Sequence, residues 1–400
     1  AEWSNEAEKN AIVAEARFFR AYAHNILANL FGGVPIADEF FSEPKFDFVR
    51  ASREDVYKFV AEDLKFASEW LPEETTMSGR IVKAAADHLL SEVYISLERY
   101  DDAISSASNV IGSGKYKLMT ERFGSTKDEP GDVYFDLFKE TNQNRSENTE
   151  TIWAFQIEYN VPGGGRYRAC RYWNCQYYNV KDPDGIAAMV LCDSLGRPNG
   201  WIRGTPYVYH GLWSDRNDMR CSDHNFRWVF YNNNPASKYF GQKIDPETYQ
   251  NIDTMRTYYP TIRKMEGIYY DGPSSPDIYV DQYAMRLAET YLLRAEAYLK
   301  KGDLQKAADD VNVVRERANA TPVASADVDM DFILDERMRE LLIEEPRLLT
   351  LIRTGTLVDR VRKYHTNGGA TIKDFHRLWP IPQTAIDANI GAKLEQNPGY

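Results

Sequence analysis

Two segments about 200 residues apart carry the same helical pattern, and this repetition constrains the fold more than any other feature of the chain. Residues 81–98 and 101–111 have the apolar spacing of two successive helices, and residues 283–301 and 304–318 have it again. A shift of 204 residues superposes the two pairs, so that Glu92 meets Glu296, Tyr94 meets Tyr298, Ala103 meets Ala307 and Val110 meets Val314.

Each helix pair has the physical features of a tetratricopeptide unit. Small alanines allow two helices to approach closely, and an aromatic residue stands one turn before a tight turn that leads into an antiparallel second helix. Two such units separated by so long a segment do not form a tandem array. We therefore predict one helical scaffold, built from both ends of the chain and interrupted by a long insertion.

Further helices are predicted around these pairs. The apolar stripe that starts at Phe18 predicts a helix that ends at the glycines of positions 32 and 33. A second helix is predicted over 53–70, with Ser52 as its N-cap in a capping box. Near the end of the chain, the spacing of leucines predicts a helix over 333–345.

The insertion, residues 115–280, has a different character. It is rich in glycine, asparagine, proline and aromatic residues, and its helical periodicity is weak. Residues 151–159 predict a short strand, and the rest predicts ordered loops laid over the scaffold. The predicted fold is mainly α, with helical scaffold at 1–114 and 281–400 around the insertion, all in one compact structural unit. Binding residues are expected in the insertion, because long loops on a rigid frame are where they tend to lie.

Composition and charge narrow the function. The chain has 400 residues and a net charge of −12, and nucleic-acid binding is disfavoured because such proteins usually carry a basic footprint. No apolar run is long enough for a membrane-spanning helix. No charged-then-apolar leader opens the chain, so we expect any export signal to have been removed or to lie upstream. The unusual feature is the 13% aromatic content, with 26 tyrosines and 8 tryptophans.

The stretch NVPGGGRYRACRYWNCQYYN, residues 160–179, concentrates these aromatics beside cationic and amide groups. Sugars present flat C–H faces and a rim of hydroxyls, which proteins meet with aromatic rings and with polar side chains respectively. The stretch therefore predicts a ligand platform, and tryptophans beside turns elsewhere in the insertion extend it. The predicted ligand-binding residues are Arg171, Trp173, Asn174, Tyr177, Tyr178, Trp201 and Trp213.

A packing role competes with this interpretation, since aromatic residues commonly fill cores. Some rings of the stretch would then hold a long loop on the helices. Trp153 lies in a strand-like run and Trp228 in an apolar piece, so both are assigned to the core, and Trp379 in the C-terminal tail is assigned a structural role.

Catalytic and metal-binding patterns are weak. The chain has no nucleophile elbow, no zinc-protease motif, no P-loop and no dinucleotide fingerprint, and the acids of the insertion are explained more simply as solvated turn residues. Four cysteines lie in the insertion, and only Cys170 and Cys175 are close in sequence, which disfavours a zinc site. Disulfides and buried free thiols both remain open. We expect no catalytic residue, no metal and no cofactor.

Four stretches together resemble the SusD/RagB family of surface lipoproteins of Bacteroidetes. Residues 14–36 are similar to the family's helix with a Gly-x-Val-Pro turn, and 283–318 to its late tetratricopeptide pair. Residues 333–355 are similar to its Glu-Arg-x-x-Glu-Leu helix, and 378–400 to its C-terminal signature. Two departures stand out. Residues 345–348 replace a Gly-His-Arg-aromatic run, and the family's lipidated cysteine and upstream stretch are not seen, so we expect an N-terminally incomplete chain.

The resemblance implies a protein of nutrient capture. It implies a lipid-anchored position on the outer membrane at the cell surface, with membrane contact only through an anchor outside this segment. The implied function is non-catalytic capture of oligosaccharides and their delivery to a SusC-type TonB-dependent transporter. Two alternatives remain open at this point: a peptide-binding member of the same family, and a surface glycoside hydrolase, which would need two suitably spaced carboxylates.

Overall fold

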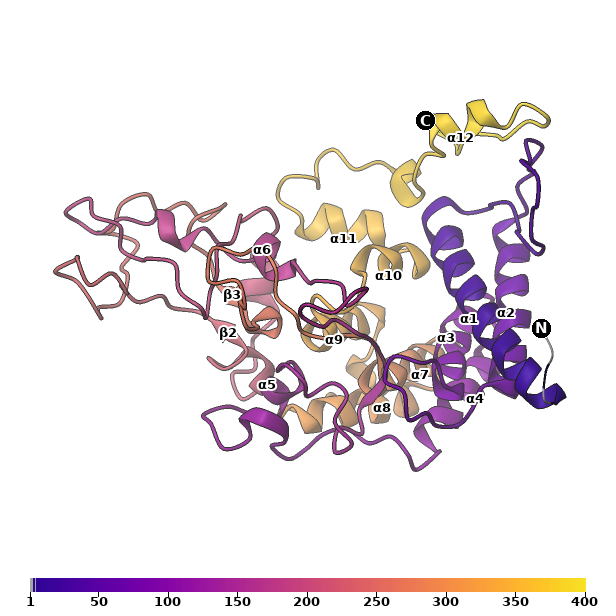
Figure 1. Ribbon diagram of the computed structural model, residues 1–400, viewed down its shortest axis with the longest axis horizontal. Helices are drawn as coiled ribbons and strands as arrows, with labels where there is room; N and C mark the ends of the chain where they lie inside the picture. Colours follow the sequence, from indigo (N-terminus) through magenta and orange to yellow (C-terminus); the bar gives the residue numbers. More distant parts are fainter. Residues whose placement is uncertain (1–2, 4) are drawn as a thin grey trace. The chain divides into compact units, whose positions relative to one another are not determined.

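The computed structural model describes residue 3 and residues 5–400 of the chain (Figure 1). Its contacts divide the chain into two compact units. The first, here called the helical unit, contains residues up to 116 together with 287–311 and 323–400. The second, here called the loop unit, contains residues 117–286 and 312–322. The chain therefore forms two compact units where the sequence led us to expect one.

The helical unit is built from helices of both chain ends. The N-terminal part supplies α1 (Glu6–Phe31), α2 (Arg53–Trp70), α3 (Lys83–Ser96) and α4 (Tyr100–Ile111). The later part supplies α7 (Leu287–Lys301), the first turns of α8 (Leu304–Arg317), α9 (Met330–Leu341), α10 (Arg347–Arg353), α11 (Leu357–Tyr364) and α12 (Gln383–Ala388). The mainly helical fold predicted from the sequence is confirmed.

Local signals set the ends of the first two helices. At the end of α1, Gly32 takes φ +74° and its amide donates to the carbonyl of Ala28, a conformation that favours glycine because it has no Cβ. At the start of α2, the hydroxyl oxygen of Ser52 accepts from the amide of Asp55 at 3.0 Å. The predicted cap residues of both helices are thereby confirmed.

The two predicted helix pairs meet through α3, α4 and α7, which pack on one another in the helical unit. Ala103 on α4 and Ala288 on α7 are fully buried, as expected for helices that approach closely. The two superposable glutamates both lie in polar networks of this unit. Glu92 accepts from the side-chain amide of Asn25 at 2.9 Å, and Glu296 binds both Nη atoms of Arg353 at 2.7 and 2.8 Å.

Two predicted helices are shorter than expected. Residues 283–286 are strand instead of helix, and α7 begins only at Leu287. The helix predicted over 333–345 runs from Met330 to Leu341. The backbone leaves the helical conformation soon after Leu341, with Ile343 at φ +75°, and Pro346 disfavours helical backbone at Glu345.

The loop unit holds two small antiparallel pairs of strands. Strand β1 (Thr151–Phe155) pairs with β4 (Gln282–Arg286), and β2 (Phe226–Arg227) pairs with β3 (Thr261–Ile262). The strand predicted at 151–159 is thus confirmed over its first five residues. Two short α-helices, α5 (Val133–Leu137) and α6 (Ala169–Trp173), and several single-turn 3-10 or π segments also lie in this unit, and much of the remaining chain forms turns and segments without regular structure.

Buried ion pairs and aromatic rings hold the loop unit together around α5. Its Tyr134 and Leu137 lie in a hydrophobic cluster with Tyr283 of β4. Beside it, Glu150 accepts from the guanidinium groups of Arg286 at 2.7 Å and Arg317 at 2.9 Å, and all three side chains are buried.

No helix in the described part of the chain is long and apolar enough to cross a membrane.

Candidate ligand-binding surface

The aromatic stretch of residues 160–179 folds into a turn and two short helical segments. Gly163 and Gly165 take φ +82° and +66° in the turn, and the amide of Glu158 donates to the carbonyl of Gly164 at 2.7 Å across it. Helix α6 follows, and Tyr177 opens a 3-10 turn. The glycines therefore close a tight loop before the aromatic residues begin.

A second loop, residues 197–203, runs beside this stretch and is held to it by backbone hydrogen bonds. The amide of Asn199 donates to the carbonyl of Arg171 at 2.6 Å. The amide of Trp201 donates to the carbonyl of Tyr172 at 3.0 Å. These hydrogen bonds hold residues about 30 positions apart in sequence next to each other. They join main-chain atoms and do not depend on side-chain contacts.

The two loops bring Trp201 and Tyr172 into a parallel stack. Their ring centroids lie 5.4 Å apart and their planes differ by 8°. The side chain of Trp201 is 65% exposed, so one face of the indole lies against the tyrosine and much of the rest is open to solvent. An exposed ring that is fixed from behind offers a flat apolar surface at little entropic cost to a ligand.

Four of the seven predicted ligand residues lie on these two loops with at least part of their surface accessible. They are Arg171, Trp173, Tyr178 and Trp201. The hydroxyl of Tyr178 donates to a carbonyl of the 197–203 loop at 3.0 Å. Within the described residues, the guanidinium of Arg171 has only one long hydrogen bond, 3.4 Å to another carbonyl of that loop. Its other donors are therefore available to a ligand.

The other three predicted ligand residues lie in the interior of the loop unit. Tyr177 is 1% exposed, and its hydroxyl donates to the carbonyl of Gly196 at 2.5 Å. Trp213 is 2% exposed and packs edge-on against Phe226 with 5.4 Å between ring centroids. Asn174 is also 2% exposed. These side chains have no face to offer a sugar, because packing encloses them, and the candidate surface is corrected accordingly.

Three tyrosines form a second exposed aromatic cluster that the sequence analysis missed. Tyr159 and Tyr270 stack with centroids 4.7 Å apart and an angle of 12°, and Tyr279 lies edge-on to both. Their hydroxyls reach carboxylates, since Tyr159 donates to Asp271 at 2.8 Å and Tyr270 donates to Glu140. No local pattern announces this cluster, because Tyr159 lies more than 100 residues before the other two tyrosines. Tyr172 belongs to the aromatic stretch singled out from the sequence, although it is not among the seven predicted ligand-binding residues.

The sequence left disulfides and buried free thiols open for the four cysteines, and the structure favours free thiols. All four are free thiols, and three of them are buried. Burial raises the pKa of Cys170 to about 11 and that of Cys175 to about 12, which keeps both protonated at neutral pH. In the described residues no group of three or more histidine, cysteine or acidic side chains is arranged to hold a metal ion.

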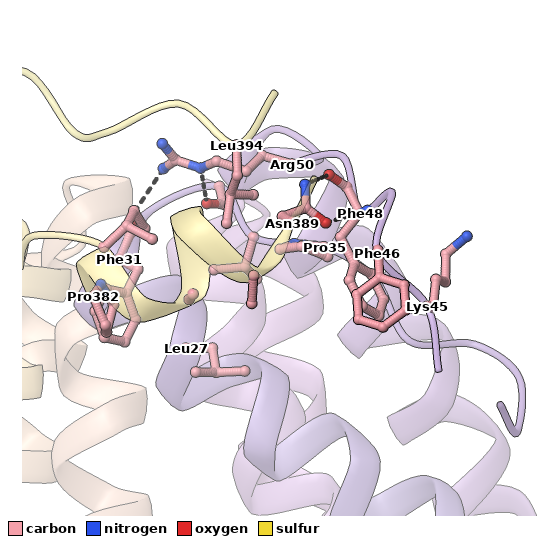
Figure 2. Close-up of a pocket in the computed structure, with 15 residues that line it drawn as sticks. Leu27, Phe31, Pro35, Lys45, Phe46, Phe48, Arg50, Pro382, Asn389 and Leu394 are labelled. Atoms are coloured by element: carbon pink, nitrogen blue, oxygen red, sulfur yellow. Dashed lines mark hydrogen bonds between the residues drawn. The ribbon is translucent and has the colours of Figure 1, made fainter. Parts of the chain in front are cut away.

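The helical unit contains an apolar cavity of about 510 Å³ (Figure 2). It lies between the end of α1, the segment 33–50 and α12, and its apolar lining includes Leu27, Phe31, Phe46, Phe48, Pro382 and Leu394. Its polar side chains are already engaged. Arg50 donates to the carbonyls of Phe31 and Gly33, and Asn389 donates to the carbonyl of Phe48. The cavity therefore offers little to recognise sugar hydroxyls, and the loop surface is the better candidate.

Two family models match the two ends of the chain. The model described as "SusD family" matches residues 214–400, and the model described as "Starch-binding associating with outer membrane" matches residues 1–95. The resemblance noted in four separate stretches therefore extends over most of the chain. The chain belongs to the SusD family.

Curated members of the SusD family align along nearly the whole chain. The starch-binding protein SusD of Bacteroides thetaiotaomicron is 26% identical over 428 aligned residues, which cover 100% of this chain and 74% of that protein. A SusD-like protein of Formosa agariphila is 24% identical over 417 residues, covering 96% of this chain and 72% of that protein.

Solved structures of the SusD family share the fold. A SusD superfamily protein from Bacteroides vulgatus superposes with a TM-score of 0.72 at 20% identity, covering 99% of this chain and 79% of that one. A laminarin-binding SusD-like protein gives 0.70 at 20% identity, with 99% and 80% covered. The surface glycan-binding protein A from Bacteroides fluxus gives 0.69 at 23% identity, with 100% and 80% covered.

Proposed function

We propose that this chain captures oligosaccharides at the cell surface without catalysing their hydrolysis. The observation that carries the proposal is the exposed indole of Trp201 stacked on Tyr172, which offers a flat apolar face beside polar groups. The C–H face of a sugar ring packs on such a surface, and its hydroxyls need donors and acceptors at the edge. Arg171 supplies donors there, and Trp173 and Tyr178 extend the surface.

The names of related proteins support the same class of ligand. One relative is named for starch, one structural neighbour for laminarin and another for surface glycans. Chemically different glucans and other glycans share C–H faces and hydroxyl rims, so the chemistry common to these ligands is the chemistry that the Trp201 surface offers. The identity of the glycan depends on groups around the platform.

The proposal extends to location and partner. A family model that matches residues 1–95 is described as associating with the outer membrane. We place this protein there, at the cell surface and held by a lipid anchor, where captured oligosaccharide passes to a SusC-type TonB-dependent transporter. Co-purification of the transporter with a tagged chain from outer membranes is the direct test of that partner.

A titration tests the capture function. The purified chain is mixed with a panel of neutral oligosaccharides and with mixed peptides, while tryptophan fluorescence and heat are recorded and the products are analysed by chromatography. We expect saturable binding of one glycan class with no cleavage. Saturation by peptides alone would assign the chain to a peptide-binding branch. Turnover of a glycan, abolished by replacing one carboxylate, would make it a hydrolase.

A further inference from the structure

The ammonium group of a lysine next to α5 packs against an aromatic ring and, within the residues that the structure describes, is not paired with a carboxylate. Lys139 follows this helix, and its ammonium nitrogen lies 3.6 Å from the centroid of the Phe135 ring. Cation–π attraction holds a charge in such a position but does not neutralise it. Among the described residues, no carboxylate lies within ion-pair distance of Lys139 Nζ.

Two arginines at the β2–β3 strand pair extend the positive charge. Arg227 ends β2, and Arg263 directly follows β3. Both bind one carboxylate: Nη2 of Arg227 lies 2.8 Å from Oε1 of Glu266, and Nε of Arg263 lies 2.9 Å from its Oε2. The guanidinium of Arg263 also lies 5.2 Å from the centroid of the Phe135 ring. Lys139 and Arg263 thus share the Phe135 ring, and Arg263 and Arg227 share the Glu266 carboxylate.

The other acid near Lys139 is already used. Asp136 is fully buried and accepts from Nε and Nη2 of Arg122, at 2.5 and 3.0 Å. That pair is neutral by itself. Among the described residues, Glu266 is the carboxylate that binds both Arg227 and Arg263, so these two guanidinium groups and the unpaired Lys139 carry a positive excess in a chain whose net charge is −12.

The cluster also has hydrogen-bond donors without acceptors. Nε of Arg227 is enclosed and has no hydrogen-bond partner, which costs free energy because a buried charged donor is left unpaired. Burial, opposed by Glu266 and reinforced by the charge of Arg263, lowers the pKa of Lys139 to about 8. The cluster is nevertheless reachable, because the side chains of Arg227 and Arg263 are each 24% exposed.

We propose that Lys139, Arg227 and Arg263 form a binding site for an oxyanion, either a carboxylate or a sulfate group carried by a ligand. An oxyanion supplies the acceptors that the three side chains lack, and the planar fork of an arginine suits such groups. A neutral sugar would leave the excess charge unchanged. The site is distinct from the Trp201 surface, and its proposal does not depend on glycan capture there.

The test is titration of the full chain with sodium sulfate, with sodium D-glucuronate and with D-glucose, at constant ionic strength set by chloride. Lysine side chains are labelled by reductive ¹³C-methylation, so that the Lys139 signal reports binding by NMR. We expect sulfate, glucuronate or both to shift this signal saturably and to raise the pKa of Lys139, while glucose leaves it unchanged. Sulfate alone or glucuronate alone would identify which oxyanion the site takes.

Variants make the assignment specific. Lys139→Gln should raise the dissociation constant of the anion about tenfold, the loss expected for one hydrogen bond to a charged group. Its matched control is Lys181→Gln, which removes an exposed lysine elsewhere in the loop unit and should not change the constant. Lys139→Arg keeps the charge and should retain binding. Trp201→Ala should also retain it, which separates this site from the capture surface.

Two results would overturn the proposal. One is the same response to chloride as to sulfate and glucuronate, since that is a general ionic effect. The other is equal anion affinity in the wild type and in folded Lys139→Gln. If Lys139→Gln fails to fold, the Lys139 signal of the wild-type chain decides the question by itself, and an unshifted signal counts against the site.

Discussion

The indole of Trp201 lies parallel to the ring of Tyr172, with 5.4 Å between centroids and 8° between planes. The backbone amide of Trp201 donates to the carbonyl of Tyr172, so the same two residues are joined through the main chain and through their rings. The exposed indole is thereby held in one orientation before any ligand arrives. Pre-organisation of this kind reduces the entropy lost on binding.

Replacement of Trp201 by alanine should weaken glycan binding and leave folding intact. The expected loss is about 1–3 kcal/mol, the range of truncations at ligand-contacting aromatic residues. Stability should change little, because the side chain is 65% exposed. Calorimetric titration with the oligosaccharide that saturates the wild-type chain, together with a thermal melt, measures both quantities.

A matched control for this variant is Phe40→Ala. Phe40 is 90% exposed and belongs to the helical unit, so it removes an exposed ring of similar size without touching the loop surface. Trp173→Ala should also weaken binding if its ring contacts ligand. Unchanged affinity in both tryptophan variants would assign these rings to packing and remove the basis of the proposed surface.

Replacement of Trp213 by alanine should lower the stability of the fold, in contrast to Trp201→Ala. This side chain is 2% exposed and packs against Phe226, so its removal leaves a cavity in the core of the loop unit. The expected cost is about 3–5 kcal/mol of unfolding free energy. Urea unfolding followed by fluorescence and circular dichroism measures it. Wild-type stability combined with lost glycan affinity would return Trp213 to the ligand surface.

The helical unit could be predicted from the sequence because its signals are local. Apolar spacing marks each helix, and single residues such as Ser52 and Gly32 mark the ends. One segment next to this unit in sequence departs from its local helical signal. Residues 283–286 continue the helical spacing of α7, but they pair with β1, which lies some 130 residues earlier. Tertiary pairing overrides local preference there, and no local pattern announces it.

The ligand surface was predictable only in part. Sequence composition singled out Trp173, Tyr177 and Trp213 by the same criterion, an aromatic residue in a polar loop. The structure separates them by burial, which depends on how distant loops pack. Trp201 was found because a turn flanks it, and Tyr172 belongs to the predicted aromatic stretch, but the stacking of the two rings is recognised only once the two loops are seen side by side.

The cysteines should behave as unreactive thiols in the folded chain. The structure has four free thiols, and burial raises the pKa of Cys175 to about 12, so little reactive thiolate forms at pH 8. Alkylation of the native chain with iodoacetamide, followed by mass spectrometry, should modify Cys192 first, because it alone of the four is not buried. Unfolding in urea without a reductant should release all four. Fewer than four labelled sites would reveal a disulfide.

Acid should destabilise the helical unit through Glu289. Burial opposes ionisation of this carboxylate, but a hydrogen bond from His88 and the charge of Arg337, whose Nη2 lies 2.6 Å from Oε1, together lower its pKa to about 2. A folded-state pKa below the ordinary value of 4.5 means that the ionised group stabilises the fold above about pH 4.5. This contribution, on the order of 3 kcal/mol, is lost as the pH falls towards 2.

Glu289→Gln should therefore be less stable at pH 7 and should lose less stability on acidification, measured by urea unfolding at several pH values. Glu247→Gln, at an exposed position, is the control, and parallel pH profiles for wild type and Glu289→Gln would contradict the assignment.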